Sequence, residues 1–529
     1  MSLLDVLFAA NRRASYQRAL RHARSRVTVD GEAEAHRRVA RELTPSSGGF
    51  TFGTFGPDAD PVQLADDTAL ASALVIGASG SGKTRFILGL LQNAIERSLL
   101  PGVAGVLGVD LELVDPKQET FDLLSQYLAA LWLAADAATR ERIASAVRVI
   151  DWSRDAVTPV APFDNMAGEV SNTYLAFLRT DVAIQAGEHS YSGALRQAFF
   201  MFACVLVERR FPPNYRFAMR FLDDETYRRR ILEGVADGDV RAFFEEAKHS
   251  LPKQTRDALL RRIQSDMSFP EVRLSVGIPP PDLDGLLPRR ATPIVLGNYG
   301  SSMTLPLAKG KERASYRLID VLLSAPRRDP RRRGLLVIDE SPMLLSEENE
   351  LTAALMEGAR TLRSAGMGVL FAAQDFANAL PSQIVRTLML NTRWWAVFQS
   401  REEAEWIYPH IVRTQSDTSE AERHREFVRT IQNLRRQHFY LYVKGHSALP
   451  LRAPDVGDPA LRSAAELRAV FRREIASRST IAARTAADLI AKWEAEVVDQ
   501  ASVLPAPPPT KARSPRGIEQ LMKDLGLGK

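Results

Sequence analysis

Gly77-Ala-Ser-Gly-Ser-Gly-Lys-Thr84 is the stretch that decides the fold of this chain. It matches the phosphate-binding loop pattern, in which glycines let backbone N–H groups curl around a phosphate. A short apolar run, Leu74–Ile76, precedes the loop, and a helical pattern covers about Lys83–Leu99. The loop therefore joins a strand to a helix N-terminus, which is the context that the motif requires. The residues expected to bind nucleotide here are Gly77, Ala78, Ser79, Gly80, Ser81, Gly82, Lys83 and Thr84.

Strand and helix patterns alternate around this loop. After the first helix come an apolar run at 103–114, a helical pattern at about 120–133 and a third apolar run at 146–150. This alternation predicts a parallel sheet with crossover helices. Later apolar runs expected to be strands lie at 293–297, 335–338, 369–373, 394–398 and 439–443, the last of which should be the final strand. The predicted fold class is α/β, with a mainly parallel sheet, helices on both faces and an all-helical insertion.

Composition shifts divide the chain into five parts. The strand pattern stops between Met166 and Leu287, and proline clusters punctuate a helix-like stretch there. The last residues begin with Pro505-Ala-Pro-Pro-Pro509, a composition typical of flexible segments. The predicted parts are a basic helical region at 1–60 that ends in a loop at 46–60, an ATPase domain at 61–165 and 288–455, the helical insertion at 166–287, C-terminal helices at 456–500 and a flexible tail at 501–529.

Overall composition excludes several classes of protein. The 529 residues are 45% hydrophobic and 25% charged, which is typical of a globular protein and not of a disordered or fibrous one. Cys204 is the only cysteine, so no intrachain disulfide and no cysteine-based zinc site can form. No apolar run reaches the roughly 18 residues of a membrane span. We expect a cytoplasmic protein, or one held peripherally at the inner membrane by a partner.

Acidic and amide side chains follow two of the predicted strands. Leu335-Leu-Val-Ile-Asp339-Glu340 would bring Asp339 to the Mg²⁺ ion, through water, and Glu340 to the attacking water molecule. Lys83 would reach the β- and γ-phosphates of ATP, and Thr84 would ligate the Mg²⁺. Gln374 ends the next strand, where it could sense the γ-phosphate or orient water. Arg360 or Arg363 could neutralise transition-state charge at a neighbouring subunit's site.

These features together resemble the FtsK/HerA superfamily of ring-forming ATPases, and within it the coupling proteins of conjugation and type IV secretion, the TraG/TraD class. The resemblance spans about residues 65–455. The segments that carry it are Gly77–Thr84, Asp115-Pro-Lys117, Pro162-Phe-Asp-Asn165, Ile338-Asp-Glu340, Arg363 through Gln374, and Asn391. It implies a RecA-like P-loop NTPase core, a homohexamer with ATP and Mg²⁺ bound between subunits, and DNA threaded through the ring. It also favours Arg363 as the arginine that acts on the neighbouring site.

Candidate DNA contacts are the arginines of the segment Pro326–Arg333, namely Arg327, Arg328, Arg331, Arg332 and Arg333. Each could neutralise one phosphate, although a solvated surface explains the cluster equally well. Because the segment precedes the strand that ends at Asp339, we expect it at the sheet edge opposite the nucleotide. The net charge of +5 is too small to argue for a nucleic-acid partner by itself.

The resemblance predicts an ATP-hydrolysing hexameric motor of the conjugative coupling type, which moves DNA or nucleoprotein. Two alternatives stay open: an ATPase that powers export of protein substrates, and a HerA-like ATPase of DNA processing or defence. Relaxase or effector proteins, or a membrane-anchoring subunit, are the expected partners. Coupling proteins usually begin with transmembrane helices, and none is expected in this chain.

Overall fold

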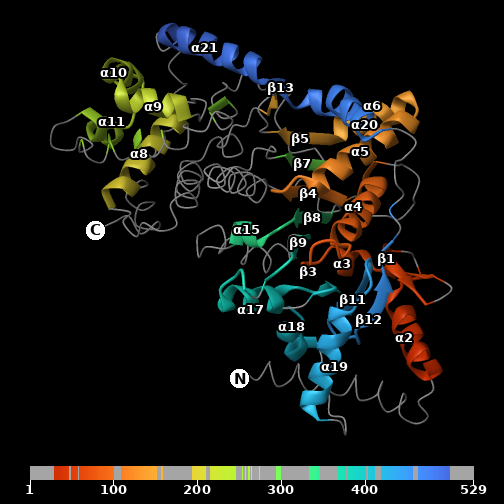
Figure 1. The fold of residues 1–529 in the computed structure, drawn as a ribbon. Helices are drawn as coiled ribbons and strands as arrows, with labels where there is room; N and C mark the ends of the chain where they lie inside the picture. The colour runs from red at the N-terminus through yellow and green to blue at the C-terminus, as the bar shows by residue number, and fades with distance from the viewer. Residues whose placement is uncertain are drawn as a thin grey trace.

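The fold is that of a computed structural model, shown in Figure 1. It describes residues 29–46, 49–56, 59–99, 109–151, 156–158, 193–209, 215–245, 294–298, 333–345, 366–376, 378–400, 403–411, 419–454, 456 and 463–500, with isolated residues between 253 and 274. Within these ranges the molecule is built around one large twisted sheet with helices on both sides, and a group of helices, α8–α11, lies apart from it.

The large sheet has 11 strands in the order β2-β1-β12-β11-β10-β3-β9-β8-β4-β7-β5. From β10 to β5 every neighbouring pair is parallel, whereas β2, β1, β12, β11 and β10 pair antiparallel. The parallel strands are β3 (Ala73–Ile76), β4 (Val109–Asp115), β5 (Val147–Asp151), β7 (Ile294–Asn298), β8 (Arg333–Ile338), β9 (Met367–Ala373) and β10 (Trp394–Phe398). The antiparallel part adds β1 (Phe50–Phe55), β2 (Asp60–Leu64), β11 (His438–Val443) and β12 (Leu449–Arg452). The predicted α/β class with a mainly parallel sheet is confirmed.

Helices cover both faces of the sheet because the parallel strands carry apolar side chains on both faces. One face carries α2 (Val29–Leu43), α4 (Lys83–Leu99), α5 (Glu119–Ala134), α6 (Ala137–Ala146) and α20 (Ala464–Val470). The other face carries α15 (Pro342–Leu345), α17 (Ser382–Asn391), α18 (Glu403–Ile411) and α19 (Glu420–Gln432). Trp394 packs toward the first face and Trp395 toward the second, as the two-residue period of a strand requires.

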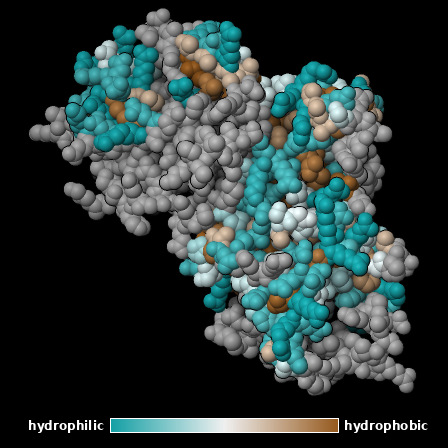
Figure 2. Space-filling view, viewed as in Figure 1, coloured by the Kyte–Doolittle hydropathy of each residue, from teal (hydrophilic) through white to brown (hydrophobic). Residues whose placement is uncertain are grey.

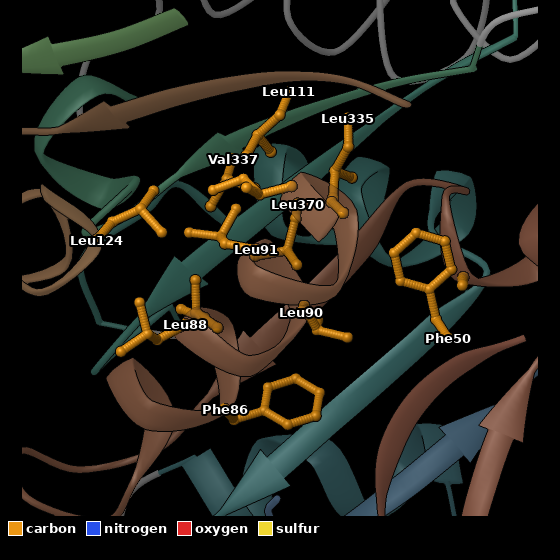
Figure 3. Close-up of a cluster of buried hydrophobic side chains, with 14 of the residues drawn as sticks. Phe50, Phe86, Leu88, Leu90, Leu91, Leu111, Leu124, Leu335, Val337 and Leu370 are labelled. Carbon is orange, nitrogen blue, oxygen red and sulfur yellow. The ribbon is translucent and has the colours of Figure 1, made fainter. Parts of the chain in front are cut away.

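The helix that follows the phosphate-binding loop, α4, is buried along one side against the first face of the sheet. In Figure 3 the α4 side chain Leu91 lies beside the β9 side chain Leu370, and Leu90 and Phe86 follow along the same helix in the same core cluster. Phe86, Ile87 and Leu91 are fully buried. Burying a Leu or Phe side chain contributes about 1.5–3 kcal/mol. This packing holds the N-terminus of α4 at the carboxyl edge of the sheet, beside the ends of β8 and β9.

Two sequence predictions about strands were wrong. Residues 50–55, within the predicted loop at 46–60, form β1, because Phe50, Phe52 and Phe55 are buried in the core and outweigh the glycine-rich composition around them. Phe52 packs edge-on against Trp394, with ring centroids 4.7 Å apart. The run at 439–443 is not the final strand either. β12 follows it, with Leu449 and Leu451 buried, and β13 (Ile481–Ala482) pairs with β6 (Ala156–Val157).

The described elements of the predicted insertion are all helical, as expected. They are α8 (Gly193–Arg209), α9 (Tyr215–Asp223), α10 (Glu225–Glu233) and α11 (Gly238–Glu245). Phe202, Phe221 and Phe244 are buried among them, and the Phe221 and Phe244 rings meet at 5.0 Å. The described surface in Figure 2 is mostly hydrophilic, with small, separate apolar patches.

Candidate nucleotide site

The phosphate-binding loop leaves β3 and enters α4 at the carboxyl edge of the sheet. Gly80 and Gly82 have φ values of +75° and +114°, which L-residues with a side chain rarely adopt. The buried ammonium of Lys83 donates hydrogen bonds to the carbonyls of Gly77, at 2.5 Å, and Ala78, at 3.2 Å. Burial lowers the pKa of Lys83, while the negative charges of Glu340 and Asp339 act in the opposite direction. The lysine therefore lies within the field of the two acids that the sequence predicts for this site.

Two neighbouring segments brace the loop. The Ala78 N–H donates to the carbonyl of Gln399 at 2.7 Å, just after β10, and the Gln437 N–H donates to the carbonyl of Ser81 at 2.8 Å. A Cβ on Gly82 would lie 3.0 Å from the Gln437 Cα, so glycine is needed there for contact as well as for conformation. The residues next to β10 and β11 therefore hold the loop in place through backbone hydrogen bonds.

Asp339 and Glu340 follow β8. In the sheet, β9 lies between β8 and β3, the strand that leads into the loop. Asp339 is buried, and its Oδ2 accepts a hydrogen bond of 2.7 Å from the hydroxyl of Thr120, at the start of α5. Its Oδ1 accepts from the Glu340 N–H at 3.0 Å. Burial raises the pKa of Asp339, and the Thr120 hydrogen bond opposes that shift. The aspartate is therefore fixed on both oxygens by groups of its own chain.

Glu340 occupies the left-handed backbone region, with φ +49°. A non-glycine residue there costs free energy and persists only where the surroundings hold it, as at many functional sites. Gln374, after β9, donates to Glu340 Oε1 at 2.8 Å, and Lys117, after β4, lies 2.8 Å from the same oxygen. The Glu340 side chain is 14% exposed. Three strand ends therefore converge on one carboxylate.

Asp115 ends β4 and organises the turn that carries Lys117. Its carboxylate accepts hydrogen bonds from the backbone N–H groups of Lys117, Gln118 and Phe121, at 3.0, 2.9 and 2.9 Å. Burial, together with the nearby charge of Asp339, raises the pKa of Asp115 to about 7. Asp115 and Asp339 are therefore a pair of buried acids on adjacent strands.

The residues at this edge fit a nucleotide with a magnesium ion. The loop crest, Ala78–Gly80, is exposed, and Thr84 is half-buried in the first turn of α4. The buried Ser81 hydroxyl has no hydrogen-bond partner among the described residues, which leaves it free to bind a ligand. Carboxylate and hydroxyl oxygens are the ligands that Mg²⁺ prefers, and the loop's N–H groups suit phosphate.

The structure brings most of the predicted site residues together and leaves others untested. Lys83, Asp339, Glu340 and Gln374 converge at one edge. Arg333 is the first residue of β8, so it lies at the opposite edge, as expected, where it forms an ion pair of 2.7 Å with Asp67. Arg360 and Arg363, together with Arg327, Arg328, Arg331 and Arg332, lie outside the described residues.

Sequence reasoning missed two residues of this site. Thr120 was not singled out, and Lys117 appeared only as part of a resemblance. The signal for Lys117 was its place directly after a predicted strand, at the edge where the other strand ends meet. No local signal could have paired Thr120 with Asp339, because the two are 219 positions apart in the chain.

The fold of this chain recurs in solved structures. The chain is similar in fold to the conjugative coupling protein TrwB. The unbound bacterial TrwB and its complex with ADP and Mg²⁺ each match with a TM-score of 0.51 at 15% identity; the matches cover 81% of this chain and 95% and 94% of theirs. VirB4 of Thermoanaerobacter pseudethanolicus matches with a TM-score of 0.50 at 14% identity, over 78% of this chain and 98% of its own.

No protein-family model matches the sequence, and no curated protein matches it. The likeness to TrwB and VirB4 therefore lies in the fold. Within the described ranges no helix combines the length and the apolar character that crossing a membrane requires.

Proposed function

We propose that this protein is a magnesium-dependent ATPase of the type IV secretion and conjugation kind. The observation that carries the proposal is the convergence of a buried P-loop lysine, Lys83, with Asp339, Glu340 and Gln374 at one sheet edge. TrwB, which shares the fold, has been solved with ADP and Mg²⁺ and with a non-hydrolysable ATP analogue. The predicted cofactors, ATP and Mg²⁺, suit this edge.

Each residue has a proposed role. The nucleotide-binding residues are Gly77–Thr84, with Lys83 on the β- and γ-phosphates, and Thr84 and Asp339 hold Mg²⁺, the latter through water. The metal would neutralise charge that develops on the phosphates. Glu340 accepts a proton from the attacking water, and Gln374 orients that water or senses the γ-phosphate. Arg363 from a neighbouring copy stabilises the transition state.

We further propose that the ATPase works as a hexameric ring that moves DNA or nucleoprotein, with the Arg327–Arg333 segment as a candidate DNA contact. Its expected partners are a relaxase or effector protein, or a subunit that anchors it at the inner membrane. The fold supports this reading, because TrwB is described as a plasmid coupling protein. Protein export and HerA-like DNA processing are the competing cargo assignments.

The test is ATP hydrolysis by the purified protein and its Glu340→Gln variant. We expect hydrolysis that requires Mg²⁺, and a loss of at least about a hundredfold in kcat for Glu340→Gln. Glu225→Gln, on the exposed surface of α10, is the matched control and should hydrolyse ATP normally. A wild-type protein that binds ATP without hydrolysing it would contradict the ATPase assignment.

A salt series with single- and double-stranded DNA tests the cargo. If DNA is the cargo, it should stimulate hydrolysis, and the stimulation should fall steeply with salt because binding displaces counterions from the phosphates. Hydrolysis that is indifferent to both forms of DNA would shift the assignment to protein cargo.

A further inference from the structure

Lys117 is a polar group at the nucleotide edge to which the proposed mechanism gives no role. Its ammonium lies 2.8 Å from Oε1 of Glu340, and the Gln374 amide donates to that same oxygen at 2.8 Å. The Lys117 side chain is 40% exposed, whereas the Glu340 side chain is 14% exposed. The lysine thus reaches from a half-exposed position to a carboxylate that is mostly buried.

Hydrogen bonds to a buried carboxylate hold the backbone of the turn that carries Lys117. The buried carboxylate of Asp115 accepts the N–H groups of Lys117 and Gln118, and Gln118 is in the left-handed region with φ +68°. Two residues later, Thr120 bonds Asp339, the residue next to Glu340. The turn after β4 is therefore tied directly to the turn after β8.

These contacts decide how the Glu340 carboxylate can rotate. A carboxylate with one donor can still turn about its last bond, whereas donors from two strand ends on the same oxygen restrict it. Both donors use Oε1, so Oε2 remains as the oxygen that can accept a proton. A general base works only if it is held within hydrogen-bond reach of the proton that it takes.

We propose that Lys117 is a positioning residue for Glu340, which together with Gln374 anchors Oε1 and leaves Oε2 to act on the attacking water. This inference rests on the proposed ATPase function. The proposal gives a residue at the end of β4 a role in the reaction.

A bland explanation is that Lys117 and Glu340 form a partly exposed ion pair of little consequence, worth about 0–1 kcal/mol. That explanation predicts small effects on stability and none on turnover. A positioning role predicts that turnover falls while nucleotide binding is largely kept, since the Lys117 ammonium forms its ion pair with Glu340 and acts on the loop residue Lys83 only through its charge. Kinetics therefore separates the two explanations better than stability does.

The experiment compares Lys117→Met, which keeps the length of the side chain without its charge, with Lys117→Arg, which keeps the charge. We expect Lys117→Met to lower kcat about tenfold to a hundredfold with KM within about twofold, as is usual when a supporting contact to a site residue is lost. Lys117→Arg should retain more activity than Lys117→Met. Lys492→Met, on α21 (Ala483–Gln500) away from the sheet edge, is the matched control and should behave like the wild type.

A double variant makes the assignment specific. In a Glu340→Gln background, adding Lys117→Met should change the residual rate less than about twofold, because the group that Lys117 positions has already been lost. An equally large further drop would overturn the proposal, and so would a Lys117→Met enzyme with wild-type kcat. In both cases the ATPase assignment would stand, because it rests on hydrolysis by the wild type and on the large loss of rate in Glu340→Gln. A wild-type protein without hydrolysis would overturn both proposals.

Discussion

Individual side chains at the nucleotide edge are held by contacts that cross long stretches of sequence. Thr120 is fully buried, and its hydroxyl donates to Asp339 Oδ2 at 2.7 Å. Leaving a buried carboxylate oxygen without its donor costs more than the hydrogen bond itself contributes. This single contact therefore supports both the fold of the edge and the charge state of Asp339.

Replacing Thr120 by valine, which has nearly the same shape, should lower the free energy of unfolding by about 1–3 kcal/mol, because Asp339 loses a buried donor. The same change should raise the pKa of Asp339 further, since the hydrogen bond now opposes the effect of burial. Urea denaturation without nucleotide measures the first effect. Thr120→Ser keeps the hydroxyl and should lose less stability than valine; a larger loss for Thr120→Ser than for Thr120→Val would show that the methyl group matters more than the hydrogen bond.

The raised pKa of Asp115 predicts how the stability of the fold depends on pH. Burial and then the charge of Asp339 raise its pKa from 3.8 to about 7, so the folded protein holds a proton that the unfolded chain releases near pH 4. The protonated Asp115 therefore stabilises the fold fully below about pH 4, and this stabilisation is lost as the pH rises through about 7. Asp115→Asn cannot titrate, so wild-type stability should fall relative to this variant between pH 5 and pH 8.

Urea denaturation at several pH values, without Mg²⁺ or nucleotide, checks this difference. Asp239→Asn, on the exposed first turn of α11, is the control and should follow the wild type at every pH. Parallel curves for wild type and Asp115→Asn would mean that Asp115 titrates in its ordinary range.

The predictable residues of the site are those whose signal is local. Lys83 and Thr84 belong to a contiguous motif, and Asp339 and Glu340 directly follow an apolar run, so each could be placed from its neighbours in sequence. The partners of those residues could not be predicted, because Thr120 and Lys117 meet them only through the order of strands in the sheet. That order depends on the packing of the whole chain and cannot be predicted from a short stretch of sequence.

Among the elements, the segment at 463–478 shows how a part outside the sheet is attached to it. It comprises α20, a π-helical turn at Phe471–Ile475 and a 3₁₀ turn at Ala476–Arg478, and it packs against α5 and α6. Leu467, Phe471 and Ile475 are buried in the core of that face, and Phe471 meets Phe121 of α5 edge-on at 6.0 Å. Arg468 and Arg478 add ion pairs to Asp122 and Glu141 at the surface.

Apolar contacts, not the ion pairs, should hold this segment. Phe471→Ala should lower the free energy of unfolding by about 3–5 kcal/mol, since it leaves a cavity at a side chain that is 3% exposed. Arg468→Ala should cost about 0–1 kcal/mol, because its pair with Asp122 is solvent-screened. Chemical denaturation of both variants decides the matter; a larger loss for Arg468→Ala would show that the ion pair is the main attachment.

Elements were predictable where their hydrophobic pattern was long and uninterrupted. The strands at 335–338 and 394–398 were placed correctly because both their faces are buried, which gives continuous apolar runs. β1 was missed because only its phenylalanines at 50, 52 and 55 carry the signal, within a segment rich in glycine, serine and proline. Such a strand forms because its core partners, Phe86 and Trp394, lie elsewhere in the chain.

At the scale of the whole molecule, one copy of the chain supplies only part of the proposed catalytic machinery. Lys83 and Glu340 are proposed to act within one copy, and Arg363 on the site of its neighbour. The two kinds of residue can therefore be separated onto different copies. This division of labour is what distinguishes a working ring from a set of independent ATPases.

Mixing two inactive variants tests that division. Lys83→Ala and Arg363→Ala should each lose at least about a hundredfold in hydrolysis when assayed alone. In an equal mixture assembled at random, about one interface in four joins an intact Lys83 to an intact Arg363, so the mixture should recover up to about a quarter of the wild-type rate. Native mass spectrometry of each sample checks that both variants assemble and mix. Mixed rings with no recovered hydrolysis would show that Arg363 serves the site of its own copy, or none, and the ring mechanism would then need another arginine.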